Sequence, residues 1–212
     1  MKRLVACVFT ICLFSGVSAA AGILYSNGTY SGVSGALIQA PYTVSDSFVL
    51  AAAGTMTGFD FASWTSTGVE LSSVDWEVGT TPFASNVASG LANSFATVVN
   101  IVDNVYTFDV DTNTVSGLNV VLGAGTYWFT LLNAVDSFGP IGWDQINGTS
   151  SAWQCQTGCG VSSNWAALTG TGGSSNVFDI VGVSSVPEPG SMGLLGGGIL
   201  AMLGMLRRRK IG

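Results

Sequence analysis

Two carboxylates in the stretch SSVDWEVG, residues 72–79, have the types and spacing for acid–base chemistry. Asp75 and Glu77 alternate on a predicted strand, so both side chains point to one face, about 6–7 Å apart along the chain. Carboxylate pairs near this separation cleave glycosidic bonds. The alternative is that these acids face water while the apolar residues that alternate with them face a core. Those apolar residues are Val74, Trp76 and Val78.

The same stretch resembles the ExDxE strand of laminarinase-like glycoside hydrolases. The resemblance implies a nucleophilic glutamate, but Ser73 occupies its position here. Because the mechanism would lack its first residue, we expect no enzymatic activity. Glycoside hydrolysis is the third of the functions we consider.

Oxygen ligands for a metal ion alternate along the stretch FDVDTNTVSG: Asp109, Asp111 and Asn113. An EF-hand loop also requires glycine at its sixth position and glutamate at its twelfth, and the sequence has Thr114 and Val120 there. A hairpin turn over residues 111–113 explains the same residues. A Ca²⁺ ion would still relieve repulsion among the acids, so calcium binding is a hypothesis without an assigned site. Otherwise we expect no metal and no cofactor.

Exposed tryptophans could bind a sugar, because an indole offers an apolar face and a polar edge. Three of the six tryptophans lie in a polar, loop-rich stretch at 141–168, where we predict a carbohydrate-binding surface as an alternative function: Trp143, Trp153 and Trp165. The other three fall in predicted strands and are expected in the core: Trp64, Trp76 and Trp128.

Basic residues are confined to the two ends of the chain. All six Lys and Arg are Lys2, Arg3 and residues 207–210, and the chain contains no His. Nucleic-acid binding is excluded because no cation is present between Leu4 and Leu206 to displace counterions. Without His or Lys the domain also has no near-neutral base and no imine-forming amine.

The region between the ends predicts one all-β domain at 22–183, an antiparallel β-sandwich of jelly-roll-like type. Val, Thr, Phe, Tyr and Trp are frequent, and Gly, Ser or Asn interrupts them every eight to twelve residues. One helix or a long loop is the expectation for residues 83–99. The predicted strands are 47–51, 55–64, 69–78, 104–111, 117–122, 125–134 and 176–183.

The N-terminus has the pattern of a secretory signal peptide, residues 1–21. A basic start precedes an apolar run from Leu4 to Phe14, and cleavage is expected after Ala19 to Ala21. The mature chain then keeps only Cys155 and Cys159, in CQTGC. We predict that they form a disulfide in an oxidising compartment.

The C-terminus predicts a single transmembrane helix. Residues 190–206 carry no charge and would form a helix of about 26 Å, slightly short of a bilayer core. The basic residues 207–210 can reach the interface and mark the cytoplasmic side. A plain membrane anchor is one interpretation of this segment.

The ending VPEPGSMGLLGGGILAMLGMLRRRK resembles the PEP-CTERM sorting signal of exported proteins from exopolysaccharide-producing Gram-negative bacteria. The resemblance covers residues 184–212 and implies processing by an exosortase that recognises Pro187, Glu188 and Pro189. The stretches at 46–64 and 122–134 resemble, more loosely, a β-sandwich that often precedes this tail.

The expected function is therefore that of an exported surface or matrix protein with a structural or interaction role in exopolysaccharide or biofilm. Its precursor would be anchored in the inner membrane before the exosortase passes it outward. The expected partners are the exosortase, the membrane before processing, and exopolysaccharide, but not nucleic acid.

Overall fold

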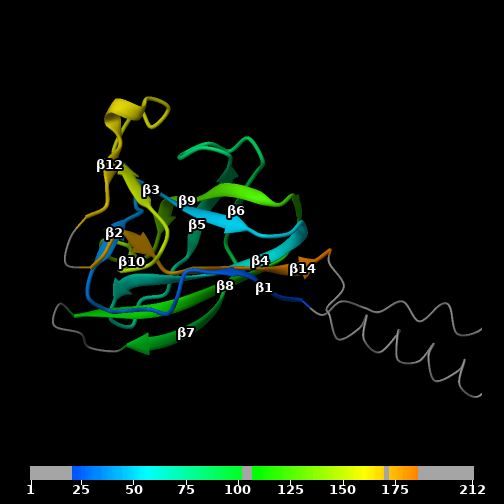
Figure 1. Ribbon diagram of the computed structural model, residues 1–212. Coiled ribbons are helices and arrows are strands. Elements are labelled where there is room, and N and C mark those ends of the chain that lie inside the picture. Colours follow the sequence, from blue (N-terminus) through cyan, green and yellow to red (C-terminus); the bar gives the residue numbers. More distant parts are fainter. Residues whose placement is uncertain (1–20, 102–106, 170–171, 186–212) are drawn as a thin grey trace, which may run out of the picture.

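The structure is a computed structural model that describes residues 21–101, 107–169 and 172–185. Its described part is all-β, as predicted: 14 strands form two antiparallel sheets (Figure 1). The predicted signal peptide at 1–21, apart from its last residue, and the tail from residue 186 lie outside the described residues.

The larger sheet has eight strands in the order β1-β14-β4-β10-β13, while β8 pairs with β4, β7 with β8, and β2 with β10. Its strands are β1 (Gly22–Ser26), β2 (Gly35–Leu37), β4 (Gly54–Ser66), β7 (Ala96–Ile101), β8 (Phe108–Leu122), β10 (Gly142–Ile146), β13 (Ser175–Asn176) and β14 (Phe178–Ser184). The long strand β4 pairs with β8 along one edge and with β14 and β10 along the other.

The smaller sheet has six strands in the order β12-β11-β3-β9-β5-β6. Its strands are β3 (Thr43–Leu50), β5 (Ser73–Gly79), β6 (Ala88–Ala92), β9 (Gly125–Val135), β11 (Ala152–Cys155) and β12 (Ala166–Ala167). A 3₁₀ turn at Ser162–Asn164 precedes β12.

Aromatic side chains from both sheets fill the space between them. Phe59 on β4 lies 4.8 Å from Phe129 on β9, measured between ring centroids, and Phe178 on β14 lies 6.1 Å from Phe48 on β3. All four are essentially inaccessible to solvent. Each Phe alternates with residues on the opposite face, so the period of two in the sequence directs the rings inward.

The expected helix or long loop at 83–99 is wrong for most of that segment, which forms β6 and the beginning of β7. Gly90 lies against the indole of Trp76, where an added Cβ would come to 3.0 Å from the ring, so glycine suits the close pairing of β6 with β5. The β-branched run Thr97-Val98-Val99 favours a strand over a helix, and it pairs with β8.

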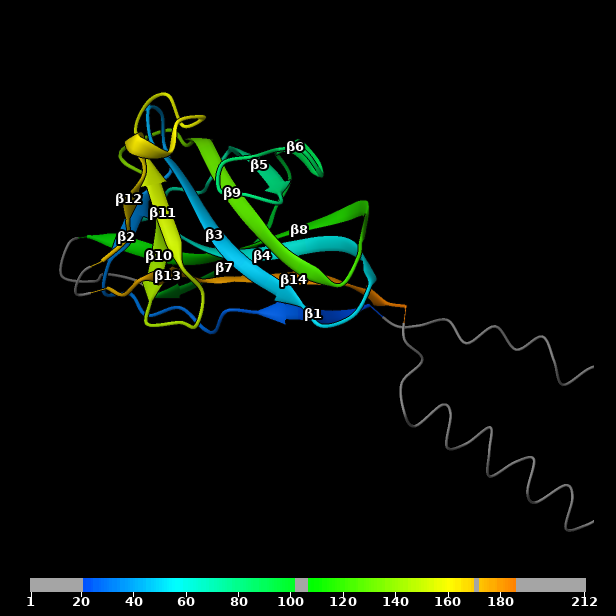
Figure 2. The same cartoon turned by 45° about the horizontal axis from the view of Figure 1, so that its top comes forward.

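Both ends of the described domain leave from one side. Gly22 at the start of β1 pairs with Gly182 near the end of β14, and the backbone N–H of Ser185 donates to the carbonyl of Ala53. Figure 2 shows β1 and β14 side by side at this edge. The chain that leads to residue 186 therefore begins beside the first strand of the domain.

Candidate functional site

The predicted sorting residues Pro187, Glu188 and Pro189, and the apolar segment at 190–206, lie outside the described residues. Within 21–101, 107–169 and 172–185, no helix is long and apolar enough to cross a membrane. The candidate site of the described domain therefore lies on its two sheets.

The outward face of the smaller sheet brings together residues from two hypotheses, the sugar-binding tryptophans and the acid pair. Five residues are direct cross-strand neighbours in one line, which we call the outer row: Trp153, Ser45, Thr130, Glu77 and Ser89. Neighbouring strands are about 4.8 Å apart, so Trp153 and Glu77 stand about 14 Å from each other. The row faces away from the core because Val78 and Phe129, which alternate with its members, are buried inside.

One end of the outer row carries three aromatic side chains, which we call the aromatic corner: Phe83, Trp153 and Trp165. The Trp165 ring centroid lies 5.3 Å from that of Phe83 and 6.4 Å from that of Trp153, and the planes of the two indoles are inclined at 61°. Both indoles are half-buried. The corner is therefore an angled pair of rings and not a flat platform, and one ligand ring could contact only one indole face.

The predicted disulfide supports this corner. Cys155 and Cys159 are bonded, with their Cα atoms 5.6 Å apart, which confirms the pairing. The indole Nε1 of Trp165 donates to the carbonyl of Cys159 at 2.7 Å. The small loop that the disulfide closes therefore fixes the orientation of Trp165.

The centre of the outer row is closed. Ser45 and Thr130 are completely buried, and the Thr130 hydroxyl donates to Ser45 Oγ at 2.8 Å. The backbone N–H of Phe83 donates to the same Ser45 oxygen, so the segment after β5 lies over this point. A ligand on this face would meet the aromatic corner or the acidic end, but not the hydroxyls between them.

The acidic end holds Asp75 and Glu77, both half-buried on the outward face. Asn133 Nδ2 donates to Asp75 Oδ2 at 2.9 Å. Burial raises the pKa of Glu77, and the charge of Asp75 raises it further. Val74, Trp76 and Val78 are buried, as the alternating pattern predicts. The two acids can accept hydrogen bonds from hydroxyl groups, but Ser73 still occupies the position of the nucleophile.

Trp143 does not belong to a sugar-binding surface. It is fully buried, its Nε1 donates to the carbonyl of Val177 at 2.7 Å, and its ring packs against Phe129 and Phe178. The prediction was wrong because the polar stretch around Trp143 is strand β10, where alternation turns the indole inward. Trp64 and Trp76 are buried as predicted, whereas Trp128 is only half-buried.

The predicted hairpin turn at 111–113 is also wrong. Strand β8 runs through these residues without interruption, and Asp111 and Asn113 pair with Ser63 and Phe61 of β4. Pairing along the full length of β4 keeps the segment extended. Asp109 and Asp111 are consequently buried on one face of the strand.

A buried polar cluster between β1, β3 and β13 was missed from the sequence. Asp46 is fully buried, and its Oδ2 accepts from Asn27 Nδ2 at 3.2 Å and from the backbone N–H of Asn176 at 2.6 Å. Asn27 Nδ2 also reaches Ser150 and Ser175, whose hydroxyls bond to each other. Burial raises the pKa of Asp46 to about 7, although the hydrogen bonds lower it. Its position between Val44 and Phe48, both inward, is the signal that could have revealed it.

Two further acids face each other on the outer surface of the larger sheet. Asp60 on β4 and Asp179 on β14 are directly opposite in register, and each has a buried Oδ1 without a hydrogen-bond partner. Burial raises the pKa of Asp179, a bond from Ser26 lowers it, and the charge of Asp60 raises it. They line a hollow of about 180 Å³ with Tyr30 and Thr112.

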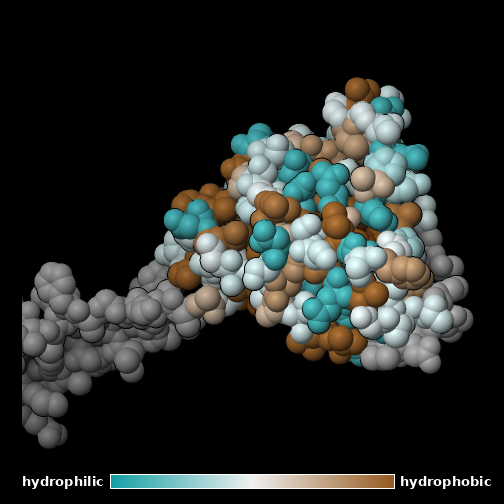
Figure 3. Space-filling model, turned by 180° about the vertical axis from the view of Figure 1, so that it is seen from behind, coloured by the Kyte–Doolittle hydropathy of each residue, from teal (hydrophilic) through white to brown (hydrophobic). Residues whose placement is uncertain are grey.

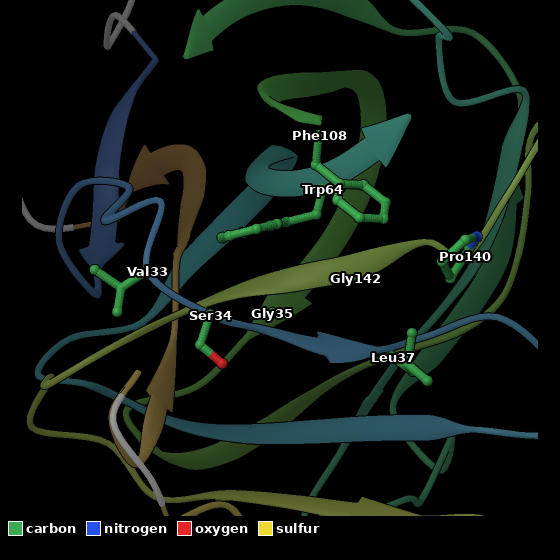
Figure 4. A pocket seen from close by; sticks show the side chains of 8 residues that line it. All are labelled: Val33, Ser34, Gly35, Leu37, Trp64, Phe108, Pro140 and Gly142. Carbon is green, nitrogen blue, oxygen red and sulfur yellow. The ribbon is translucent and has the colours of Figure 1, made fainter. Parts of the chain in front are cut away.

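A larger hollow of about 330 Å³ lies beside β2 and β10 (Figure 4). Trp64 and Phe108 form one wall, and Gly35 and Gly142 lie on the neighbouring strands. The indole Nε1 of Trp64 donates to Asp144 Oδ1 at 2.7 Å, and this carboxylate also accepts from the backbone N–H groups of Ser31 and Gly32. The polar edge of Trp64 is therefore hydrogen-bonded inside the protein and does not face the hollow as a free donor. The residues that line the hollow include no group for acid–base chemistry.

The large exposed apolar residues are spread over several strands. In the view of Figure 3, hydrophobic and hydrophilic residues are interspersed over the face of the domain. The most exposed examples include Ile23, Leu91, Val121 and Phe138. Among the residues that the structure describes, no three Asp, Glu, Cys or His side chains are grouped to hold a metal ion.

The described part of the chain is an all-β domain whose two ends lie on one side, and the C-terminal tail follows it in the sequence. Residues 185–210 match the PEP-CTERM protein-sorting motif. The chain therefore carries the sorting motif of an exosortase substrate, as predicted from Pro187, Glu188 and Pro189, and the motif supports an exported surface protein. Comparisons with curated proteins and with solved structures found no match.

Proposed function

We propose that this protein acts at the cell surface or in the extracellular matrix as a structural or interaction partner of exopolysaccharide, and not as an enzyme. The observation that carries the proposal is the match of residues 185–210 to the sorting motif. An exosortase would process the precursor near Pro187-Glu188-Pro189 while the apolar segment holds it in the inner membrane.

The shape of the domain supports presentation away from the membrane. Its first and last described strands end side by side, so a tether after Ser185 would hold the domain by that edge. The segment that contains the disulfide projects from the opposite side of the domain (Figure 1). The aromatic corner would then face the surroundings of the cell.

Carbohydrate binding is the second candidate function, and the outer row favours it. Half-buried indoles at one end and carboxylates at the other offer stacking faces and hydrogen-bond acceptors, the two features that a sugar ring uses. The rigid strands and the disulfide hold these groups in place without a ligand. In this interpretation Trp153 and Trp165 contact the polysaccharide, and Asp75 and Glu77 accept bonds from its hydroxyl groups.

Cell fractionation of the producing bacterium tests the main proposal. We expect the wild-type chain in the surface or matrix fraction, together with exopolysaccharide. A variant with Pro187→Ala, Glu188→Ala and Pro189→Ala should stay in the inner membrane, whereas Ser191→Ala, just beyond the motif, should behave as wild type. Equal surface delivery of the triple variant would contradict exosortase sorting. Release of the chain from a strain without exopolysaccharide would support the matrix role, and unchanged retention would contradict it.

A further inference from the structure

Six aspartates have a buried oxygen without a hydrogen-bond partner among the described residues: Asp46, Asp60, Asp109, Asp111, Asp136 and Asp179. Only three of them are buried as whole residues, with 0% of Asp46, 4% of Asp109 and 2% of Asp111 exposed. Asp46 stands alone within its cluster of amides and hydroxyls. Asp109 and Asp111 are close neighbours on one strand. They are the two buried acids whose unpartnered oxygens could share one ligand.

The two carboxylates lie on the same face of β8, about 6–7 Å apart along the strand. Each has one satisfied oxygen: the backbone N–H of Gly68 donates to Asp109 Oδ2 at 2.8 Å, and the Thr65 hydroxyl donates to Asp111 Oδ2 at 2.9 Å. The Oδ1 atom of each residue is buried and has no hydrogen-bond partner. Both acids therefore present one bare oxygen inside the protein.

No basic side chain of the described residues can neutralise this pair, because the sequence has no Lys, Arg or His between Leu4 and Leu206. Glu70 adds a third negative charge close enough to act on Asp111. Burying carboxylates without a counter-charge is strongly unfavourable. One shared proton would leave one negative charge in place, whereas one divalent ion cancels two charges and supplies a ligand position for both bare oxygens.

We infer that Asp109 and Asp111 bind a hard divalent cation, with Ca²⁺ as the ion expected outside the cell. Such ions prefer carboxylate oxygens and complete their shell with water when the protein supplies few ligands. Because no three acids of the described residues are grouped to hold one ion, the affinity should be low, with a Kd of about 10⁻⁴–10⁻³ M, as in extracellular calcium modules. The site goes beyond the proposed function and does not depend on it.

Thermal unfolding of the full chain, purified in detergent with its tail, tests the inference. Circular dichroism would follow unfolding in 5 mM EDTA, in about 5–10 mM CaCl₂ and in the same concentration of MgCl₂. We expect Ca²⁺ to raise the melting temperature by about 3–6 °C. A response to Mg²⁺ alone would still support a hard-cation site but would reassign the ion. Equal melting in EDTA and in both salts would overturn the inference.

Asparagine variants locate the ion. The double variant Asp109→Asn and Asp111→Asn keeps the shape of both side chains, so it should lose the cation response and melt higher than wild type in EDTA. The matched control, Asp75→Asn with Glu77→Gln, removes an acid pair of the same spacing and should keep the full response. Retention of the response in the first variant would overturn the assignment. Should that variant fail to fold, calorimetric titration of wild type decides: one ion bound per chain supports the site, and none refutes it.

Discussion

The backbone N–H of Asn176 donates to Oδ2 of Asp46 at 2.6 Å in the space between the two sheets, and both residues are fully buried. Tyr25 on β1 is the other titratable group near this contact, and its pKa is raised by burial and by the charge of Asp46. A carboxyl group thus occupies a core position in a domain that has no cation to pair with it.

The Asp46 contact predicts that mild acid stabilises the protein. Burial raises the pKa of Asp46 from its ordinary value of 3.8 to about 7. Between pH 3.8 and about pH 7 the folded chain holds a proton that the unfolded chain has lost. The free energy of unfolding therefore falls as pH rises, by up to roughly 1.4 kcal/mol per pH unit. Above pH 7 the contribution of Asp46 levels off.

Melting temperatures measured between pH 4.5 and pH 8 check this prediction, and they should decrease with pH. Burial also raises the pKa of Asp111, Asp144 and Asp179, so these groups act in the same direction. Asp46→Asn resembles the protonated carboxyl and should flatten the profile and raise the melting temperature at pH 8. A melting temperature that rises with pH would contradict the protonated state of Asp46.

Replacement of Trp143 should destabilise the fold far more than replacement of Trp153. Trp143→Ala would empty the space between Phe129 and Phe178 and leave the Val177 carbonyl without its donor, at a cost of about 3–5 kcal/mol. Trp153→Ala removes a half-buried ring and should lower stability by about 1 kcal/mol or less. Urea unfolding of the two variants measures the difference, and equal losses would refute the burial of Trp143.

Removal of the charge on Asp179 should stabilise the domain. Asp179 and Asp60 are directly opposite on adjacent strands, where like charges repel. Asp179→Asn should therefore increase the free energy of unfolding by about 0.2–1 kcal/mol at pH 8 and have little effect at pH 4. Asp60→Asn, which removes the other charge of the pair, should give a gain of similar size. A destabilised Asp179→Asn variant at pH 8 would show that the pair is not repulsive.

The disulfide should matter more for the aromatic corner than for the fold. It closes a loop of only a few residues, so chain entropy alone gives it about 2 kcal/mol. Cys155→Ser with Cys159→Ser should fold under oxidising and reducing conditions alike. The tryptophan emission of this variant should shift toward that of exposed indole. The reason is that the hydrogen bond from Trp165 to the Cys159 carbonyl depends on the loop. Unchanged tryptophan emission would argue against this anchoring role.

Alternation of apolar and polar residues made the fold class predictable, as in Val74, Trp76 and Val78, because one buried face leaves a period of two in the sequence. The same rule failed for residues 83–99, where apolar residues at helical spacing suggested a helix but the chain forms two edge strands in different sheets. It also failed for Trp143, because the polar residues that follow it, Asp144 and Gln145, concealed a short inward-facing strand. Pairing partners distant in the chain decided these cases, and a single sequence does not reveal them.

The candidate site was predictable only in parts. Cys155 and Cys159 are close in the sequence, so their pairing follows from spacing and compartment. The outer row joins Trp153 to Glu77 through β3 and β9, and this proximity depends on strand order alone. The buried acids Asp46, Asp109 and Asp111 required the structure, since acids are normally expected at the surface.

Binding of the exported chain to purified exopolysaccharide of the producing strain tests the central claim most directly. Sedimentation of the polymer with increasing protein concentrations, with Ca²⁺ present, would give the bound fraction. We predict saturable binding by wild type, and weaker binding by Trp153→Ala and Trp165→Ala if the aromatic corner is the contact. Tyr30→Ala, an exposed aromatic replacement away from that corner, should bind as wild type. Absence of saturable binding by the wild-type chain would contradict a role in association with exopolysaccharide.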